Sequence, residues 1–184
     1  PLGGREGTIG IWNTESGECE AVLGGHSNWV LGLAISPAGD LVASSSVDRT
    51  TRLWNANLHS EQQVLASAKQ STAEHLVFDA TGERLFIGHR DGWVTSWDVA
   101  NGNPGSTWPA FGYSLSGLMI HDDRLIATSR SDPQVKVRDL TRASDVAAFD
   151  LGLGFLNHSQ ASSDGTYFAF VGGNGQVLIK RLGD

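Results

Sequence analysis

The stretch Gly7-Thr8-Ile9-Gly10-Ile11-Trp12-Asn13 contains a glycine turn, then alternating apolar residues, then a large side chain. The same shape returns in residues 49–55, 92–98, 133–139 and 175–181. The sixth residues of the five stretches stand at positions 12, 54, 97, 138 and 180, at intervals of 42, 43, 41 and 42 residues. Near-equal intervals with matching residue types indicate an internal repeat of about 42 residues.

Each repeat holds further short strand signals. Apolar-rich runs predict one strand in each of four units: Val30–Ile35, Ala73–Phe78, Leu115–Ile120 and Leu156–Ala161. Turn residues such as Ser36-Pro37-Ala38-Gly39-Asp40 follow, and last strands are indicated at 20–23, 63–66 and 146–149. Antiparallel sheets of four short strands need neighbouring sheets to cover their faces. The predicted fold is therefore all-β, a propeller of four-stranded antiparallel blades in which these four runs are the innermost strands.

Composition and charge exclude several classes of protein. The net charge of −7 over 184 residues disfavours nucleic acid and anionic membranes, because both select basic surfaces. Cys19 is the one cysteine, so neither an intrachain disulfide nor a cysteine zinc cluster can form. A lone cysteine fits a reducing compartment, and we predict a cytoplasmic location. No apolar run approaches the roughly 20 residues of a membrane span.

The second unit carries a set of recognisable motifs, and the third unit contains the dipeptide Trp97-Asp98. The motifs are Gly25-His26, Trp29-Val30, Ser36-Pro37-Ala38-Gly39-Asp40, Ala43-Ser44, Asp48 and Leu53-Trp54-Asn55. In these residues the chain resembles the WD-repeat family over nearly its whole length. The resemblance implies a structural tetrad of His26, Ser44, Asp48 and Trp54. In it the Trp indole donates to the Ser hydroxyl, and the His bridges Ser and Asp.

The other units depart from this tetrad. Lys69 or Gln70, Phe111 and Gly152 stand where the family has its His. Arg138 and Lys180 replace the Trp of the last two units. We therefore expect one complete tetrad, in the second unit alone.

The phase of the repeat predicts an incomplete ring. Residues 1–24 are expected to end one blade, residues 25–67, 68–110 and 111–151 to form three blades, and residues 152–184 to supply three strands of a last blade. Common propellers have about seven blades. We expect the remaining blades to come from missing sequence, another chain or a second copy. A self-closed four-blade ring is the alternative, and residues 1–3 are either native or a cloning remnant.

The sequence offers little catalytic, cofactor or metal chemistry. Its six histidines form no pair at metal-ligand spacing. Ser44, His26 and Asp48 contain the residue types of a nucleophilic triad, but the family pattern buries the Ser, whereas a triad needs it exposed. Gly172-Gly173-Asn174-Gly175 lacks phosphate-loop spacing. We predict a protein that is not an enzyme and has no cofactor, metal or catalytic residues.

In WD propellers the usual partner surface is one narrow face, formed by loops before the inner strands and turns between the second and third strands. The candidate partner-binding residues at those places are Asn28, Trp29, Arg49, Lys69, Arg90, Trp93 and Arg130. Arg49, Arg90 and Arg130 are interpreted as one recurring turn position, forming either an arc of positive charge or ordinary solvated turn charges. Trp93 and Trp108 are expected to be exposed, and Trp29 to be either structural or exposed.

Two functions compete. The first is a protein-interaction scaffold or sensor module in a larger protein, since rigid blades present loops and the family often attaches such propellers to catalytic domains. The alternative is a ligand-binding or enzymatic propeller with its site in the central channel. Its candidate residues on the inner strands are Glu74, His75 and His158.

Overall fold

The computed structural model describes residues 7–66, 71–162 and 166–181, and every regular element in these ranges is a β-strand. The first sheet pairs β1 (Thr8–Trp12) with β2 (Cys19–Gly24). Three four-stranded antiparallel sheets follow. They are β3 (Val30–Ile35), β4 (Leu41–Ser46), β5 (Thr50–Asn55) and β6 (Ser60–Ala66); β7 (Ala73–Phe78), β8 (Arg84–His89), β9 (Trp93–Asp98) and β10 (Pro104–Pro109); and β11 (Leu115–His121), β12 (Arg124–Ser129), β13 (Gln134–Asp139) and β14 (Ser144–Asp150). The last sheet contains β15 (Leu156–Ala161), β16 (Tyr167–Gly172) and β17 (Val177–Arg181).

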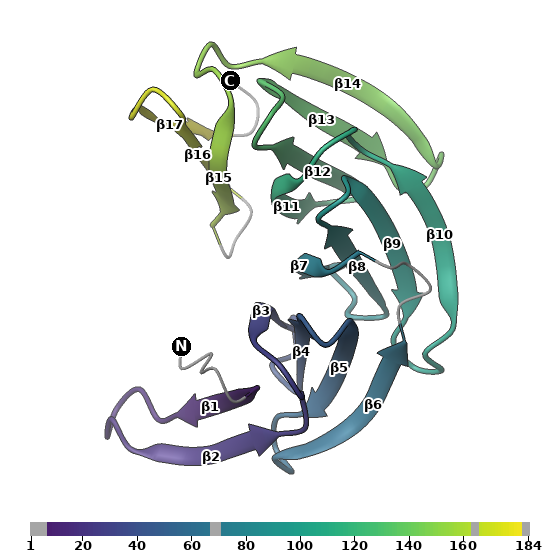
Figure 1. Cartoon of the computed structure of the whole chain (residues 1–184), viewed down its shortest axis with the longest axis vertical. Coiled ribbons are helices and arrows are strands. Elements are labelled where there is room, and N and C mark those ends of the chain that lie inside the picture. Colours follow the sequence, from purple (N-terminus) through teal and green to yellow (C-terminus); the bar gives the residue numbers. More distant parts are fainter. Residues whose placement is uncertain (1–6, 67–70, 163–165, 182–184) are drawn as a thin grey trace.

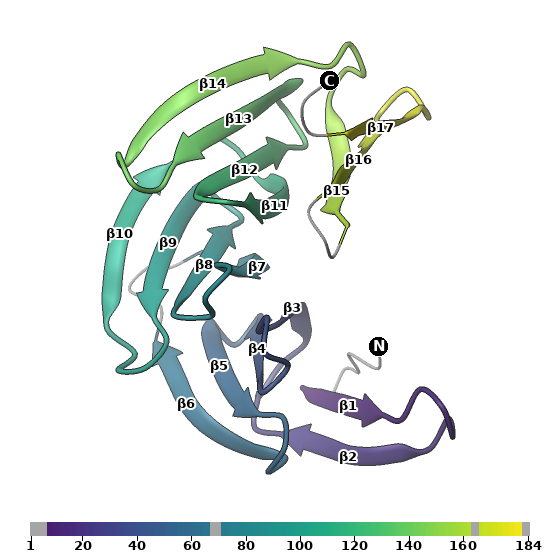
Figure 2. The same ribbon diagram turned by 180° about the vertical axis from the view of Figure 1, so that it is seen from behind.

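The sheets fan around a common centre (Figures 1 and 2). Strands β3, β7, β11 and β15 lie nearest that centre, and β6, β10 and β14 form the outer edge. The arc is open between the β1–β2 sheet and the β15–β17 sheet. The predicted all-β propeller of antiparallel blades, forming an incomplete ring within the chain, is confirmed. Among the described residues there is no helix long and apolar enough to cross a membrane.

Every inner strand has an irregularity at the same place. The pairing of inner and second strands shifts between Val30 and Gly32 in β3, and at the corresponding residues of β7, β11 and β15. A bulge of this kind re-aims the side chains that precede it. The common register makes four residues equivalent: Gly32, His75, Gly117 and His158.

In the three complete blades, the sixth residue of the repeat packs against an outer strand of the preceding sheet. Trp54 shares a buried cluster with Leu23 of β2, and Trp97 shares one with Leu65 of β6. The Arg138 guanidinium lies over the ring of Trp108 in β10, 4.6 Å from its centroid. In these three repeats the large or long side chain covers apolar area that the outer strand before it would otherwise expose.

This packing corrects the expectation that Trp108 is exposed, because only 8% of it is accessible. Its ring meets Phe86 edge-on, with 6.3 Å between the centroids, and lies beneath Arg138. In β10 it occupies the place that Leu23 has in β2 and Leu65 has in β6.

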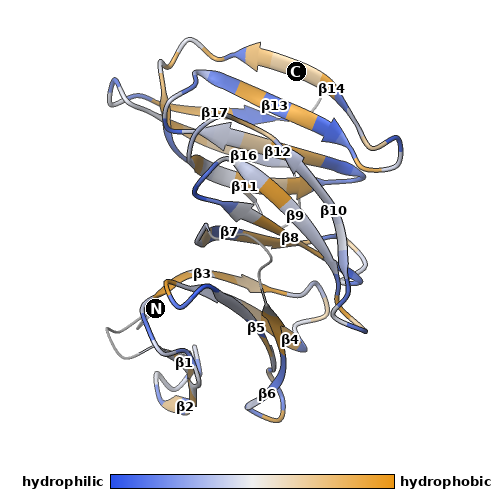
Figure 3. Ribbon diagram, turned by 45° about the vertical axis from the view of Figure 1, so that its right-hand side comes forward, coloured by the Kyte–Doolittle hydropathy of each residue, from blue (hydrophilic) through white to orange (hydrophobic). Residues whose placement is uncertain are grey.

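The two ends of the arc expose apolar residues that equivalent positions bury. Leu33 and Ile35 of β3 are 44% and 68% exposed, whereas their equivalents in β7, Leu76 and Phe78, are 8% and 4% exposed. Strand β3 is among the apolar strands in Figure 3, whereas β13 alternates apolar and polar residues. At the other end, β17 exposes Val177 and Ile179. Exposed apolar faces at both ends need covering, as in other repeat arrays.

Candidate functional site

The four residues of the expected tetrad form a continuous hydrogen-bonded chain. The Trp54 indole Nε1 donates to Ser44 Oγ at 2.8 Å, and Ser44 Oγ is 2.7 Å from His26 Nε2. His26 Nδ1 is 2.8 Å from Asp48 Oδ2. A proton on His26 Nδ1 satisfies every member, because Nε2 then accepts from the Ser44 hydroxyl and Nδ1 donates to Asp48.

The Asp48 carboxylate is held in its charged form. Burial alone would raise its pKa. Hydrogen bonds from the Thr50 side chain and backbone, from His26 and from the Ser27 backbone outweigh this effect and lower the pKa to about 2. The bonds from Ser27 and His26 tie the carboxylate to the loop before β3. The tetrad therefore fixes the shape of this loop.

The same geometry is unsuited to nucleophilic catalysis. Ser44 is fully buried, and its oxygen already accepts the indole N–H of Trp54. A nucleophilic serine must instead be exposed to substrate and lie beside an oxyanion hole. The arrangement of Ser44, His26 and Asp48 is suited to holding structure.

The other blades keep one part of the tetrad. The register places Ile87, Ala127 and Phe170 where Ser44 stands, and none of these side chains can accept the indole proton. The turn residues Asp91, Asp132 and Asn174 nevertheless accept the backbone N–H two residues on, as Asp48 does from Thr50. The Asp or Asn at this place serves the turn itself, which explains why it recurs without the His and the Ser.

Backbone hydrogen bonds join each loop before an inner strand to the turn between the second and third strands. Val47 N donates to Trp29 O, Arg90 N to Thr72 O, Arg130 N to Ser114 O and Gly173 N to Phe155 O, at 2.8–3.2 Å. All of these loops and turns thus lie at one end of the blades. We call this end the loop rim.

The bonds also correct the interpretation of the three arginines. Arg90 and Arg130 share the first turn position with Val47 and Gly173. Arg49 stands two residues later, where its N–H donates to Ser46 O as the N–H of Gly92 donates to His89 O. Its φ of 69° is in the region that glycine adopts at this position. Only two of the three arginines therefore recur at one turn position.

The remaining rim candidates differ in exposure. Asn28, Trp29, Arg49, Arg90 and Arg130 are exposed, and Trp93 is half-buried. Lys69 lies outside the described residues. Two exposed aromatic residues of the loop rim, Tyr113 and Phe155, are absent from the candidates predicted from the sequence. They could have been found by their place, because both stand just before an inner strand, as Trp29 does.

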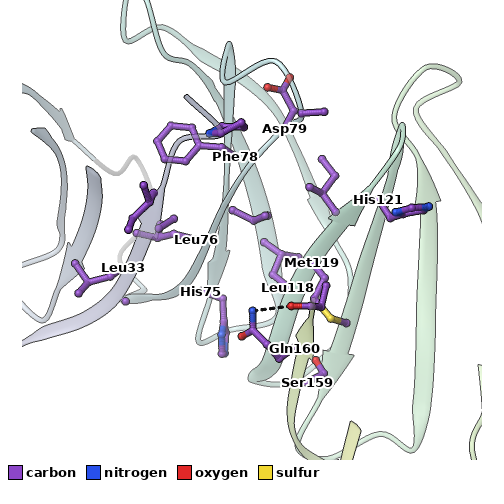
Figure 4. A pocket seen from close by; sticks show the side chains of 18 of the residues that line it. Leu33, His75, Leu76, Phe78, Asp79, Leu118, Met119, His121, Ser159 and Gln160 are labelled. Carbon is purple, nitrogen blue, oxygen red and sulfur yellow. Dashed lines mark hydrogen bonds between the residues drawn. The ribbon is translucent and has the colours of Figure 1, made fainter. Parts of the chain in front are cut away.

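The inner strands line a central cavity of about 1110 Å³ that is open to one side, where the arc is incomplete. Figure 4 shows side chains from several blades lining it, with His75 and Gln160 toward one end and Asp79 toward the other. His75 Nε2 donates to the carbonyl of Leu115 in the next blade at 3.2 Å. Burial lowers the pKa of His75 and the charges of Arg130 and His158 lower it further, while the bond to Leu115 and the Glu74 carboxylate raise it.

Charged groups gather where this cavity meets the loop rim. Arg90 Nε lies 3.9 Å from Glu74 Oε1. Within the part of the chain that the structure describes, no three His, Cys, Asp or Glu side chains are grouped so that they could hold a metal ion.

Comparisons with known proteins agree with this geometry. The family described as WD domain, G-beta repeat, matches residues 17–55. Pre-mRNA-processing factor 19 of Bos taurus is 31% identical over 150 residues, which cover 80% of this chain and 30% of that protein. The p21-activated protein kinase-interacting protein 1-like of Danio rerio is 27% identical over 147 residues, which cover 80% of this chain and 39% of that protein.

A solved structure of U3-55K superposes with a TM-score of 0.87 at 20% identity, and the match covers 98% of this chain and 56% of that one. This likeness supports the fold. The chain belongs to the WD-repeat family. It spans between 30% and 39% of the length of the two relatives named above.

Proposed function

We propose that this chain is a non-catalytic scaffold module that binds a protein partner through its loop rim. The observation that most directly supports this proposal is a set of three exposed aromatic side chains, one before each of three inner strands. Trp29 is 51%, Tyr113 64% and Phe155 50% exposed. Large aromatic side chains in fixed, exposed positions are typical anchors of protein interfaces.

The rim is preorganised for such a role. The tetrad holds the loop of Trp29, and backbone bonds join the loops of Tyr113 and Phe155 to neighbouring turns. A rigid loop loses little conformational entropy when it binds, so more of the contact energy remains as affinity. One similar protein is named for its interaction with a protein kinase, which supports a protein partner here.

The proposal includes blades that complete the ring. Exposed Leu33 and Ile35 at one end and Val177 and Ile179 at the other support this part of it. The additional blades would come from further sequence, another chain or a second copy. A sensor role and a cytoplasmic location stay predictions from the sequence.

A peptide-display selection tests the proposal without knowledge of the partner. Random sixteen-residue peptides are selected on the wild-type chain, and their affinities are measured for a variant with Trp29→Ala, Tyr113→Ala and Phe155→Ala. We expect the variant to lose at least about tenfold in affinity, or about 1.4 kcal/mol. A control variant, Trp12→Ala with Tyr167→Ala, removes two aromatic side chains of similar exposure outside the rim. Equal losses in both variants would remove the rim as the binding surface.

A further inference from the structure

We propose that Lys136 positions Tyr113, one of the three aromatic anchors of the loop rim, by holding the start of its loop in place of the hydrogen-bonded tetrad. This inference rests on the proposed function, because it states how a blade without a tetrad presents its anchor to the partner. Residues 110–114 lie between β10 and β11, and we call them the Tyr113 loop.

The Tyr113 loop and the loop before β3 are held alike at the end where each enters its inner strand. Ser46, the last residue of β4, donates from Oγ to Asn28 O at 3.1 Å. Ser129, the last residue of β12, donates from Oγ to Ser114 O at 3.0 Å. A backbone bond between loop and turn lies beside each contact. The difference between the two loops lies at their other end.

At the start of the loop before β3, the tetrad holds the chain. His26, four residues before β3, is hydrogen-bonded to Ser44 and Asp48. Phe111 stands four residues before β11 and is as deeply buried, with 4% of it exposed against 5% of His26. A phenyl ring cannot make the bonds of a histidine, and Ala127 stands where Ser44 does. The start of this loop is therefore held by another group.

Lys136 of β13 is that group. Its Nζ donates to Ala110 O at 2.8 Å and lies 4.4 Å from the centroid of the Phe111 ring. The side chain is half-buried, which strengthens both a charge-assisted hydrogen bond and a cation–π contact. None of the ion pairs among the described residues includes Lys136. Its ammonium therefore serves the loop rather than a carboxylate.

The strand position of Lys136 has a different task in the blade that keeps the tetrad. The register places Arg52 of β5 there, and its guanidinium pairs with Glu61 of β6. In that blade the cation is directed to the outer strand, and His26 holds the loop. In the blade of Lys136 the cation is directed to the loop, which has no such histidine. This contrast supports a substitution of one holding contact by the other.

The start of the Tyr113 loop determines where Tyr113 stands. The N–H groups of Ala110 and Phe111 both donate to Gly92 O, at 3.0 and 3.1 Å. A Cβ added at Gly92 would lie 2.4 Å from Tyr113 O, so the turn and the loop are in close contact. Because Gly112 alone separates Phe111 from Tyr113, a loop start that moves displaces the anchor as well.

Hydrogen exchange tests whether Lys136 holds the loop. Lys136→Met keeps an apolar stem without the donor and the charge, and we expect the amides of Ala110 and Phe111 to exchange at least about tenfold faster in it. Lys136→Arg keeps a cation that can lie over the ring, and it should restore most of the protection. The amide of Ser27, which bonds to Asp48, should be unchanged in both variants.

Lys180→Met is the matched control for the lysine. Lys180 lies on β17, the third strand of another sheet, as Lys136 lies on the third strand of its own. We expect this variant to leave the exchange of Ala110 and Phe111 unchanged. Circular dichroism checks that each variant is folded.

A double-mutant cycle tests whether the contact serves Tyr113. Peptides selected on the wild-type chain are labelled, and their affinities are measured by fluorescence anisotropy for Lys136→Met, for Tyr113→Ala and for the combination. We expect Lys136→Met to lower affinity about fivefold in the wild-type background and less than about twofold in the Tyr113→Ala background. Lys136→Arg should recover most of the loss.

Three results would overturn the inference. Unchanged exchange of Ala110 and Phe111 in Lys136→Met would mean that another contact holds the loop start. Equal losses of affinity in the two backgrounds would mean that Lys136 does not act through Tyr113. If no selected peptide loses affinity in Tyr113→Ala, the inference fails, and the proposed function stands as long as the triple aromatic variant loses its peptides. If the triple variant keeps them, the proposed function fails as well.

Discussion

At the scale of single residues, the tetrad shows why parts of a repeat signature are lost separately. Asp48 has two tasks, since one oxygen accepts from Thr50 in its own turn and the other accepts from His26. The turn task needs no partner outside the turn, so Asp91 keeps it in the next blade. The network task needs a His and a Ser together, and Ile87 at the Ser position removes it. The Asp therefore remains useful in its turn after the hydrogen bond to a His is lost.

The lowered pKa of Asp48 predicts a pH-dependent contribution to stability. A folded-state pKa of about 2, against 3.8 ordinarily, favours the folded state above about pH 4, and the benefit is lost as pH falls through about 2. Asp48→Asn should therefore lower the free energy of unfolding at pH 6 by about 1 kcal/mol, after allowance for solvent screening. Urea unfolding between pH 6 and pH 2 should show the gap from wild type closing as pH falls.

Asp91→Asn is the control for this measurement, because Asp91 keeps the turn bond without a His partner. We expect it to change stability less than Asp48→Asn at pH 6. A gap for Asp48→Asn that is constant from pH 6 to pH 2 would contradict the ionised tetrad.

At the scale of strands and turns, the sequence predicted well wherever apolar residues mark a strand and turn residues end it. Val30–Ile35, Ala73–Phe78 and Leu156–Ala161 are strands with the expected bounds. Strand β10, Pro104–Pro109, carries no apolar alternation, and its place follows from pairing with β9. The burial of Trp108 could not be predicted from its own strand either. The residues that cover it are Phe86 of β8 and Arg138 of the next blade.

Site residues were harder to predict than strands. The contacts of the tetrad lie where the family resemblance implies them, because all four residues belong to one blade. The misplaced arginine had a visible signal, since Arg49 follows its turn Asp, whereas Arg90 precedes its own. The central cavity could not be derived from spacing, because it is lined by residues of β3, β7, β11 and β15, whose approach depends on the curvature of the whole arc.

Turns of neighbouring blades contact each other closely, and this predicts an unequal cost for two glycine substitutions. Gly92 and Gly39 both have positive φ, 83° and 75°. A Cβ at Gly92 would collide with the carbonyl oxygens of Phe111 and Tyr113, whereas a Cβ at Gly39 meets nothing within 4 Å. We expect Gly39→Ala to cost about 1 kcal/mol and Gly92→Ala about 3 kcal/mol, measured by urea unfolding. Equal costs would mean that the turn of Gly92 does not pack on the following loop as described.

At the scale of the whole molecule, the arc explains why its ends differ from its middle. Each complete blade covers the apolar face of the blade that follows it. Leu53 and Ala43 of the β3–β6 blade, for example, cover Leu76 and Phe78 of the next. The equivalent residues Leu33 and Ile35 have no such cover among the described strands. Stability in stacked repeats is a sum over interfaces, so each uncovered face leaves one interface unused and available for association.

The exposed face of β3 predicts self-association of the isolated chain. We expect sedimentation velocity at micromolar concentrations to give species heavier than the 19.6 kDa monomer, because apolar end faces are buried by other copies. Leu33→Ser with Ile35→Ser should shift the distribution toward the monomer with little loss of stability, since both side chains are already exposed. The matched pair Leu76→Ser with Phe78→Ser removes buried equivalents and should destabilise the chain by several kcal/mol, about 3 or more. A wild-type chain that sediments as a stable, dispersed monomer would contradict the need for covering blades.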